Sequence, residues 1–117
     1  IVKNPRPVVA PEMLKPGSVA VSLDFDATLM ASAAQAADGM WVDDGGQFEY
    51  YREHGHFAEM PRNYEELAAL VAGGGSRRNE SDRYVVVNLG LALEDMATAL
   101  PLYRRALERE IGTLLPC

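Results

Sequence analysis

The spacing of hydrophobic side chains changes abruptly around residue 90. Residues 84–87 (Tyr-Val-Val-Val) form a short continuous apolar run, rich in β-branched side chains, which predicts a buried strand. Beyond Gly90 the apolar positions recur every three or four residues, which predicts a helix over residues 89–107 with one apolar face. The members of this face are Leu89, Leu93, Met96, Leu100, Tyr103 and Leu107. The pattern therefore predicts a strand, a tight turn at Gly90 and a core helix.

Similar patterns predict the elements upstream. Four prolines within residues 1–17 exclude a long helix, although residues 11–14 can form one helical turn with Pro11 at its start. Strand patterns occupy residues 18–23 and 40–42, and helical patterns occupy residues 28–37, 47–53 and 63–72. Asn63 is expected to cap the last of these helices, with Glu66 three residues on. Strands that alternate with helices predict a parallel α/β layer.

Three segments are predicted to depart from regular structure. Residues 76–82 are polar and charged and follow three glycines, so they are expected to form a loop. Pro101 lacks a backbone N–H and is expected to interrupt and kink the last helix. Residues 112–116 are expected to be extended.

Composition limits the class of protein. The chain has 117 residues, of which 48% are hydrophobic and 24% charged, as in an ordinary globular domain of modest core. A net charge of −6 argues against a nucleic-acid partner, because no basic field faces the phosphates. The single cysteine, Cys117, excludes an internal disulfide and a cysteine metal site, so a reducing, cytoplasmic location is expected. No apolar run reaches the roughly 20 residues that span a membrane.

Two carboxylates follow the predicted strand 18–23. Asp24 and Asp26 lie where that strand meets the next helix, and the carboxyl ends of strands in an open α/β sheet face the ligand crevice. A partly desolvated aspartate beside an amine or imine is a suitable general acid or base. Alternatively, either residue caps helix 28–37 by accepting its first free N–H groups.

Other polar and aromatic residues favour structural roles. Asp43 and Asp44 also end a strand, and their spacing favours turn and capping roles. Glu94 and Asp95 suit the N-terminal turn of the last helix, where negative charge is favourable. His54 and His56 flank a glycine, but no further ligands stand at a recognisable metal-site spacing, so we expect a loop without metal. The aromatic residues Phe48, Tyr50 and Tyr51 are expected to pack on their helix, although they could also line a pocket.

The order of several motifs resembles one known family. The segment NLGLALEDMATALPLYRRA, ending in IGTLLP, resembles the C-terminal signature of the ornithine cyclodeaminase / μ-crystallin family. Upstream, PEMLKPGSVAVSLDFD, WVDD and YEELAALVAGG follow in the order of that family, so the resemblance covers nearly the whole chain. It implies an α/β fold: the second half of a Rossmann-like NAD(P)-binding lobe in residues 1–87. Residues 88–117 would then be a helix and tail that return to a substrate and dimerisation domain.

The resemblance also implies site residues. The family's catalytic aspartate matches Asp26 best and Asp24 second, and the step beside the nicotinamide matches Asn88, Leu89 and Gly90. The amide of Asn88 offers a donor and an acceptor to a carboxamide, although Asn88 is equally suited to cap the following helix. The implied cofactor is NAD or NADP, and the implied substrate is a small amino or imino acid bound by a homodimer.

The sequence departs from the pattern of this family in two places. The family's Pro-Gly-Lys step after the aspartate is replaced by Ala27-Thr28-Leu29-Met30, with Met30 in place of the lysine. The chain also lacks a phosphate-binding loop, because the cluster Gly73-Gly74-Gly75 follows no strand and Arg78 stands where a third motif glycine would be. We therefore expect the chain to be the C-terminal part of a larger enzyme, inactive alone. The parent would be an ornithine cyclodeaminase, an imine reductase or amino-acid dehydrogenase, or a nucleotide-binding protein of the μ-crystallin type.

Overall fold

A four-stranded parallel sheet organises the chain. The computed structural model describes residues 6–74, 79–113 and 115. The strands are β1 (Val19–Ser22), β2 (Gly39–Val42), β3 (Glu65–Glu66) and β4 (Tyr84–Val87), in the spatial order β1-β4-β2-β3. Every pairing is parallel, with β4 between β1 and β2. The predicted parallel α/β architecture is confirmed at this level.

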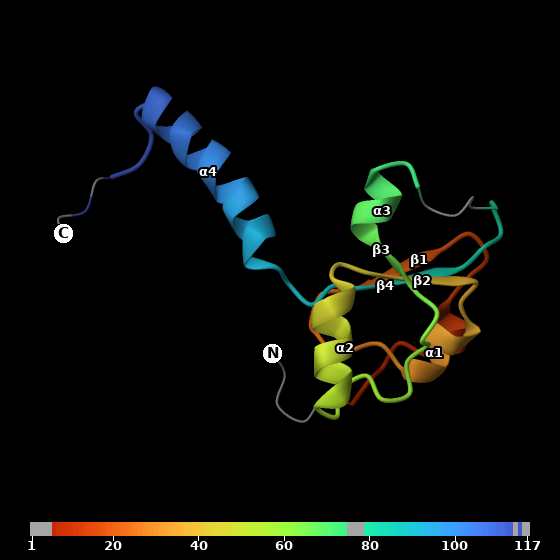
Figure 1. Cartoon of the computed structure of the whole chain (residues 1–117). Coiled ribbons are helices and arrows are strands. Elements are labelled where there is room, and N and C mark those ends of the chain that lie inside the picture. Colours follow the sequence, from red (N-terminus) through yellow and green to blue (C-terminus); the bar gives the residue numbers. More distant parts are fainter. Residues whose placement is uncertain (1–5, 75–78, 114, 116–117) are drawn as a thin grey trace.

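Alternating side chains of the strands form two apolar clusters on opposite faces. Val85 and Val87 of β4 and Val42 of β2 belong to the larger cluster, which also contains Phe48 and Ala33 from the covering helices. Val86, Tyr84 and Trp41 form the smaller cluster under Leu67 and Leu70. Figure 1 shows α1 and α2 on one side of the sheet and α3 on the other. The run 84–87 is fully buried because helices cover both faces of β4.

The helices match the predicted order, although several boundaries differ. A 3-10 turn η1 (Pro11–Met13) precedes β1, in agreement with the predicted helical turn. The α-helices are α1 (Ala31–Ala36), α2 (Gly45–Glu53), α3 (Leu67–Val71) and α4 (Ala92–Glu108). Helix α2 begins two residues earlier than predicted, because Asp44 caps it by accepting the N–H of Gln47 at 2.5 Å.

Helix α1 begins three residues later than predicted because tertiary contacts hold the preceding residues in an extended form. Thr28 accepts backbone N–H groups of Val8 and Val9 through its carbonyl, and Met30 donates to the carbonyl of Val9. Val9 and Leu29 form a parallel bridge. The helical pattern of residues 28–30 is therefore overridden by pairing with the N-terminal segment.

Helix α3 is also shorter than the predicted helix 63–72. Glu65 and Glu66 pair with Trp41 and Val42 as strand β3, so the helix begins only at Leu67. Glu66 occupies the N-cap position with no side-chain capping bond. The predicted capping role of Asn63 is wrong, since sheet formation displaces the helix start beyond it.

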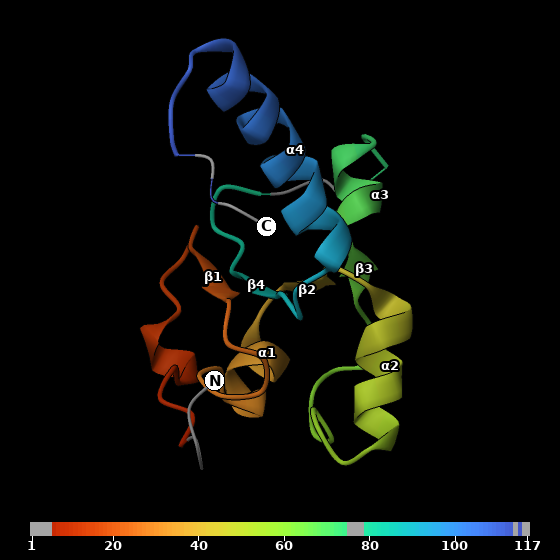
Figure 2. The same ribbon diagram turned by 90° about the vertical axis from the view of Figure 1, so that its left-hand side faces the viewer.

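Helix α4 projects away from the sheet (Figures 1 and 2) and buries none of its side chains. The predicted core role of its apolar face is therefore wrong for the described structure: Leu93 is 76% exposed and Met96 61%. The helix starts at Ala92 rather than residue 89, and it is continuous through Pro101 rather than interrupted there. Among the described residues, no helix combines the length and apolar character needed to cross a membrane.

Some predictions fall partly outside the described residues. Residues 79–82 of the predicted loop 76–82 contain turns and no regular element, as expected, whereas residues 76–78 lie outside the described part. The same holds for residues 114 and 116 of the predicted extended segment 112–116 and for Cys117.

Candidate functional site

The carboxyl ends of β1, β2 and β4 meet at one edge of the sheet. Asp24 and Asp26 follow β1, Asp43 follows β2, and Asn88 follows β4. Because neighbouring parallel strands end at the same edge, residues far apart in the sequence gather there. This edge, together with the loop after α2, is the candidate site.

Asp24 is held by two hydroxyl groups. Its carboxylate accepts hydrogen bonds from the side chain of Thr28 and, at 3.0 Å, from that of Ser22. The hydrogen bond from Thr28, aided by that from Ser22, lowers the pKa of Asp24 below its ordinary value of 3.8. The residue is therefore ionised at neutral pH and is a weak proton acceptor. It does not cap α1, whose N-cap position is Met30.

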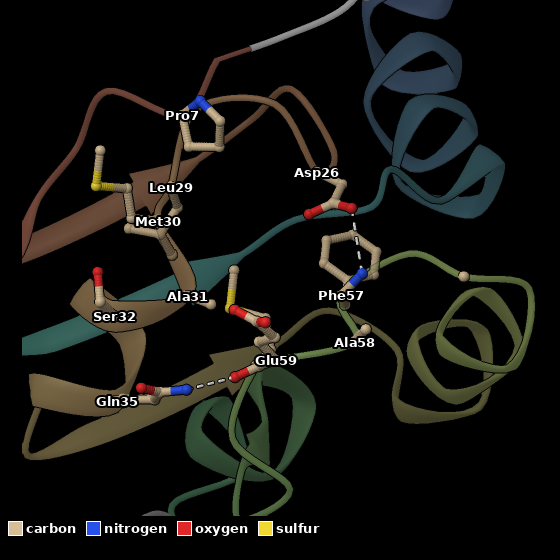
Figure 3. Close-up of a pocket in the computed structure, with 12 residues that line it drawn as sticks. Pro7, Asp26, Leu29, Met30, Ala31, Ser32, Gln35, Phe57, Ala58 and Glu59 are labelled. Carbon is tan, nitrogen blue, oxygen red and sulfur yellow. Dashed lines mark hydrogen bonds between the residues drawn. The ribbon is translucent and has the colours of Figure 1, made fainter.

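Asp26 has one oxygen held by the protein and one free. Its Oδ2 accepts the backbone N–H of Phe57 at 3.1 Å and lies 3.5 Å from Nδ1 of His56. Within the described part of the chain its Oδ1 has no hydrogen-bond partner, and Figure 3 shows this oxygen pointing into a cavity. The capping alternative for Asp26 is wrong, because this side chain binds the loop after α2 instead of α1.

Two residues beside Asp26 have left-handed backbone conformations. Phe25 has φ 63° and Phe57 has φ 51°, although neither is glycine. A left-handed conformation costs about 1–2 kcal/mol for a residue with a Cβ. The two rings meet edge to face at 4.9 Å, and Phe57 is only 3% exposed. Packing of these rings stabilises the strained backbone that fixes Asp26.

A buried aspartate fixes the turn that follows β4. Oδ2 of Asp43 accepts the backbone N–H groups of Leu89 and Gly90 at 2.7 and 2.8 Å, and Oδ1 accepts that of Asp44 at 3.0 Å. The predicted turn and capping roles of Asp43 and Asp44 are confirmed.

Asn88 extends the ladder between β1 and β4 and leaves its side-chain oxygen unpaired. Its N–H donates to the carbonyl of Ser22 at 3.0 Å. Its Oδ1 is buried without a hydrogen-bond partner in the part of the chain that the structure describes. The alternative that Asn88 caps the last helix is wrong, since the N-cap of α4 is Leu91.

Two cavities flank the pair formed by Asp26 and His56. The cavity in Figure 3 has a volume of about 510 Å³ and lies between α1 and the loop after α2. Its carboxylates come from Asp26 and Glu59, and its apolar surface comes from Leu29, Phe57 and Met60. The second, of about 430 Å³, is lined by Leu23, Asp24, Phe25, Tyr51, His56 and Leu89. The structure thus brings Asp24 and Leu89 into one cavity and Asp26 into the other. His56 lines the second cavity and lies 3.5 Å from Asp26, so the pair stands between the two cavities. The sequence pattern did not predict this contact, because residues 30 positions apart leave no local signal.

The other residues considered from the sequence are His54, the aromatic residues of α2, and the acidic residues at the start of α4. Nδ1 of His54 lies 2.7 Å from the carbonyl of Tyr50, and no group of three metal-binding side chains occurs among the described residues. Phe48 is fully buried in the core, as predicted, whereas Tyr51 lines the second cavity. Glu94 and Asp95 lie in the first turn of α4.

Comparisons with known proteins leave the family open. No model of a known protein family matches the chain, and no curated protein matches it.

Proposed function

We propose that this chain is part of an NAD(P)-dependent enzyme of the ornithine cyclodeaminase / μ-crystallin type, which moves hydride at the Cα of a small amino or imino acid. The observation that carries the proposal is Asp26, whose fixed carboxylate directs one unpaired oxygen into a cavity. The proposal also rests on the resemblance of the motifs, which implies a homodimer, while the single cysteine favours a reducing, cytoplasmic location.

The cavity in Figure 3 suits an amine. Among the described residues that line it, the charged ones are Asp26 and Glu59, both carboxylates, and none is basic. An ammonium group can donate to Oδ1 of Asp26, while apolar surface from Leu29 and Phe57 contacts the aliphatic part of the ligand. Asp26 then accepts a proton from the amine and returns it to the product nitrogen. Asp24 is less suited to this role, because its hydroxyl partners stabilise the ionised form.

The resemblance assigns the carboxamide of a nicotinamide ring to the turn after β4. Oδ1 of Asn88 is unpaired among the described residues, but it is buried and Asn88 lines neither cavity, so the side chain would have to turn outward to accept an N–H of a carboxamide. Asp43 holds Leu89 and Gly90 in place, which would fix one wall beside the ring. When bound, the nicotinamide supplies the hydride acceptor or donor. The residues that bind its phosphates would lie outside this chain.

The alternatives differ in net reaction. A cyclodeaminase releases ammonia from ornithine with no net change in NADH, whereas an imine reductase consumes NAD(P)H with cyclic imines or with 2-oxo acids and an amine. Met30, which replaces the lysine of the family step and lines the cavity, makes the reductase a close alternative. A μ-crystallin-type protein would bind the nucleotide without turning over any of these compounds.

The test uses the natural protein that contains these residues. Asp26→Asn is expected to lower turnover by about 10²–10⁴-fold, the usual contribution of a general acid or base, with nucleotide affinity nearly unchanged. Glu53→Gln is the matched control, since Glu53 is exposed at the end of α2 and lines neither of the two cavities. Near-normal turnover in Asp26→Asn refutes the assignment and directs attention to Asp24. Nucleotide binding with no turnover of any candidate compound supports the binding-protein alternative.

A further inference from the structure

His56 lies where a proton could leave Asp26 on the side away from the cavity in Figure 3. The free Oδ1 of Asp26 faces that cavity, whereas Oδ2 lies 3.5 Å from Nδ1 of His56. The side chain of His56 is 47% exposed, and that of Asp26 is 32% exposed. The imidazole is therefore in contact with both the carboxylate and water.

The surroundings of His56 hold its ring by aromatic contacts, and among the described residues its ring nitrogens have no polar partner other than Asp26. Phe25 meets the imidazole edge to face at 4.9 Å, and Tyr51 lies 6.0 Å away at a similar angle. Asp24 and Tyr51 are the other titratable groups that line its cavity, from the loop after β1 and from α2. Asp24 is committed to Thr28 and Ser22, so Asp26 is the acidic partner of His56.

A ligand in the cavity of Figure 3 creates the need for such a route. A ligand bound at Oδ1 of Asp26 covers the oxygen that took its proton, so exchange with water must proceed through Oδ2. The only nitrogen base within 4 Å of Oδ2 in the described residues is the imidazole of His56. Histidine is also the side chain that most readily gains and loses a proton near neutral pH.

We propose that His56 is the proton shuttle of this site, carrying protons between Asp26 and bulk water. The inference rests on the proposed function. In the oxidative direction the carboxyl of Asp26, protonated on the oxygen that faces the ligand, turns about its Cβ–Cγ bond so that the protonated oxygen faces His56. It then gives its proton to Nδ1, which leaves a carboxylate and an imidazolium. The imidazolium then loses the proton on Nε2 to water or buffer, and exchange with water restores the starting tautomer. The reverse sequence supplies a proton when an imine is reduced.

The first measurement is chemical rescue in the natural protein. In weak buffer, His56→Ala is expected to lower turnover by on the order of 100-fold, the lower range for a group that transfers protons. Free imidazole should restore the rate in proportion to its concentration, because truncation opens space beside the second cavity, which already holds about 430 Å³. His54→Ala is the matched control: His54 faces Tyr50, lies outside both cavities, and should show neither loss nor rescue.

The second measurement does not depend on activity. The ¹⁵N resonances of the imidazole rings report the tautomer and charge of each histidine. Asp26→Asn is expected to change those of His56 and leave those of His54 unchanged. The shuttle would be overturned if His56→Ala kept its full turnover, or if imidazole did not restore the lost turnover. It would also be overturned if the resonances of His56 were unchanged in Asp26→Asn. Turnover of no amine or imine by the unaltered protein would instead refute the proposed function, and the resonances would still test the pairing.

Discussion

The carboxylate of Asp43 accepts the backbone N–H of Gly90 at 2.8 Å, across 47 positions of the sequence. The same oxygen accepts the N–H of Leu89, and the residue is only 8% exposed. One buried side chain at the end of β2 therefore determines the path of the chain as it leaves β4. This contact positions the turn that the proposed function assigns to the nicotinamide.

Asp43→Ala is expected to lower the free energy of unfolding by about 3 kcal/mol, because the backbone N–H groups of Asp44, Leu89 and Gly90 lose a charged acceptor. Urea unfolding followed by circular dichroism measures this change. Asp44→Ala is the control, since loss of an N-cap bond costs about 1 kcal/mol. Equal losses in the two variants would contradict the central role given to Asp43.

Gly90→Ala tests the conformation of the same turn. Gly90 has φ 89°, and no atom lies within 4 Å of the position that a Cβ would occupy. The expected destabilisation of about 1–2 kcal/mol thus comes from backbone strain alone. Gly74→Ala provides the comparison, because Gly74 lies outside the left-handed region and its nearest neighbour is at an ordinary 3.4 Å. A Gly90→Ala protein as stable as Gly74→Ala would show that the turn is not held in this conformation.

The depressed pKa of Asp24 predicts a dependence of stability on pH. Since hydrogen bonds from Thr28 and Ser22 lower this pKa below 3.8, their stabilisation is fully present above 3.8 and is lost as the pH falls through the folded-state pKa. Thr28→Val is expected to destabilise the protein at pH 7, and the difference from the unaltered protein should shrink below pH 3.8. In an Asp24→Asn background, Thr28→Val should have a smaller effect that does not vary with pH. Chemical unfolding at a series of pH values measures the loss of stability in both backgrounds. If Thr28→Val lowered the free energy of unfolding equally at every pH in the unaltered background, this link to the pKa of Asp24 would be contradicted.

Pro101→Ala is expected to raise the helical stability of α4. The proline lies inside a helix that buries no side chain, so no tertiary contact offsets its missing N–H. Removing it should stabilise the helix by about 3 kcal/mol. Amide hydrogen exchange between residues 97 and 105 should slow accordingly. Leu102→Ala, at a position 63% exposed in the same helix, should change the exchange little.

Sequence patterns predicted the elements whose local preferences agree with their tertiary surroundings. The apolar run 84–87 became a central strand, and the spacing of Asp43 and Asp44 indicated their turn and capping roles. Two helix starts were predicted wrongly because a distant segment pairs with their residues. Thr28 and Leu29 pair with Val9 instead of starting α1, and Glu65 and Glu66 join the sheet instead of α3.

At the candidate site, too, the sequence determined some features and only the tertiary structure determined others. The sequence by itself determined that Asp24, Asp26 and Asn88 follow strands, since β-branched runs and the residues that end them are local features. It could not decide between the two aspartates by physical reasoning, nor exclude their capping roles. Only the tertiary structure showed that Asp24 is occupied by two hydroxyls, that Asp26 faces a cavity and that His56 lies beside it. The pairing of Asp26 with His56 arises because tertiary packing brings together side chains 30 residues apart, a separation that local periodicity does not record. The partners of Asp24 are only two and four residues away, but periodicity does not specify the path of the loop that lets them bond.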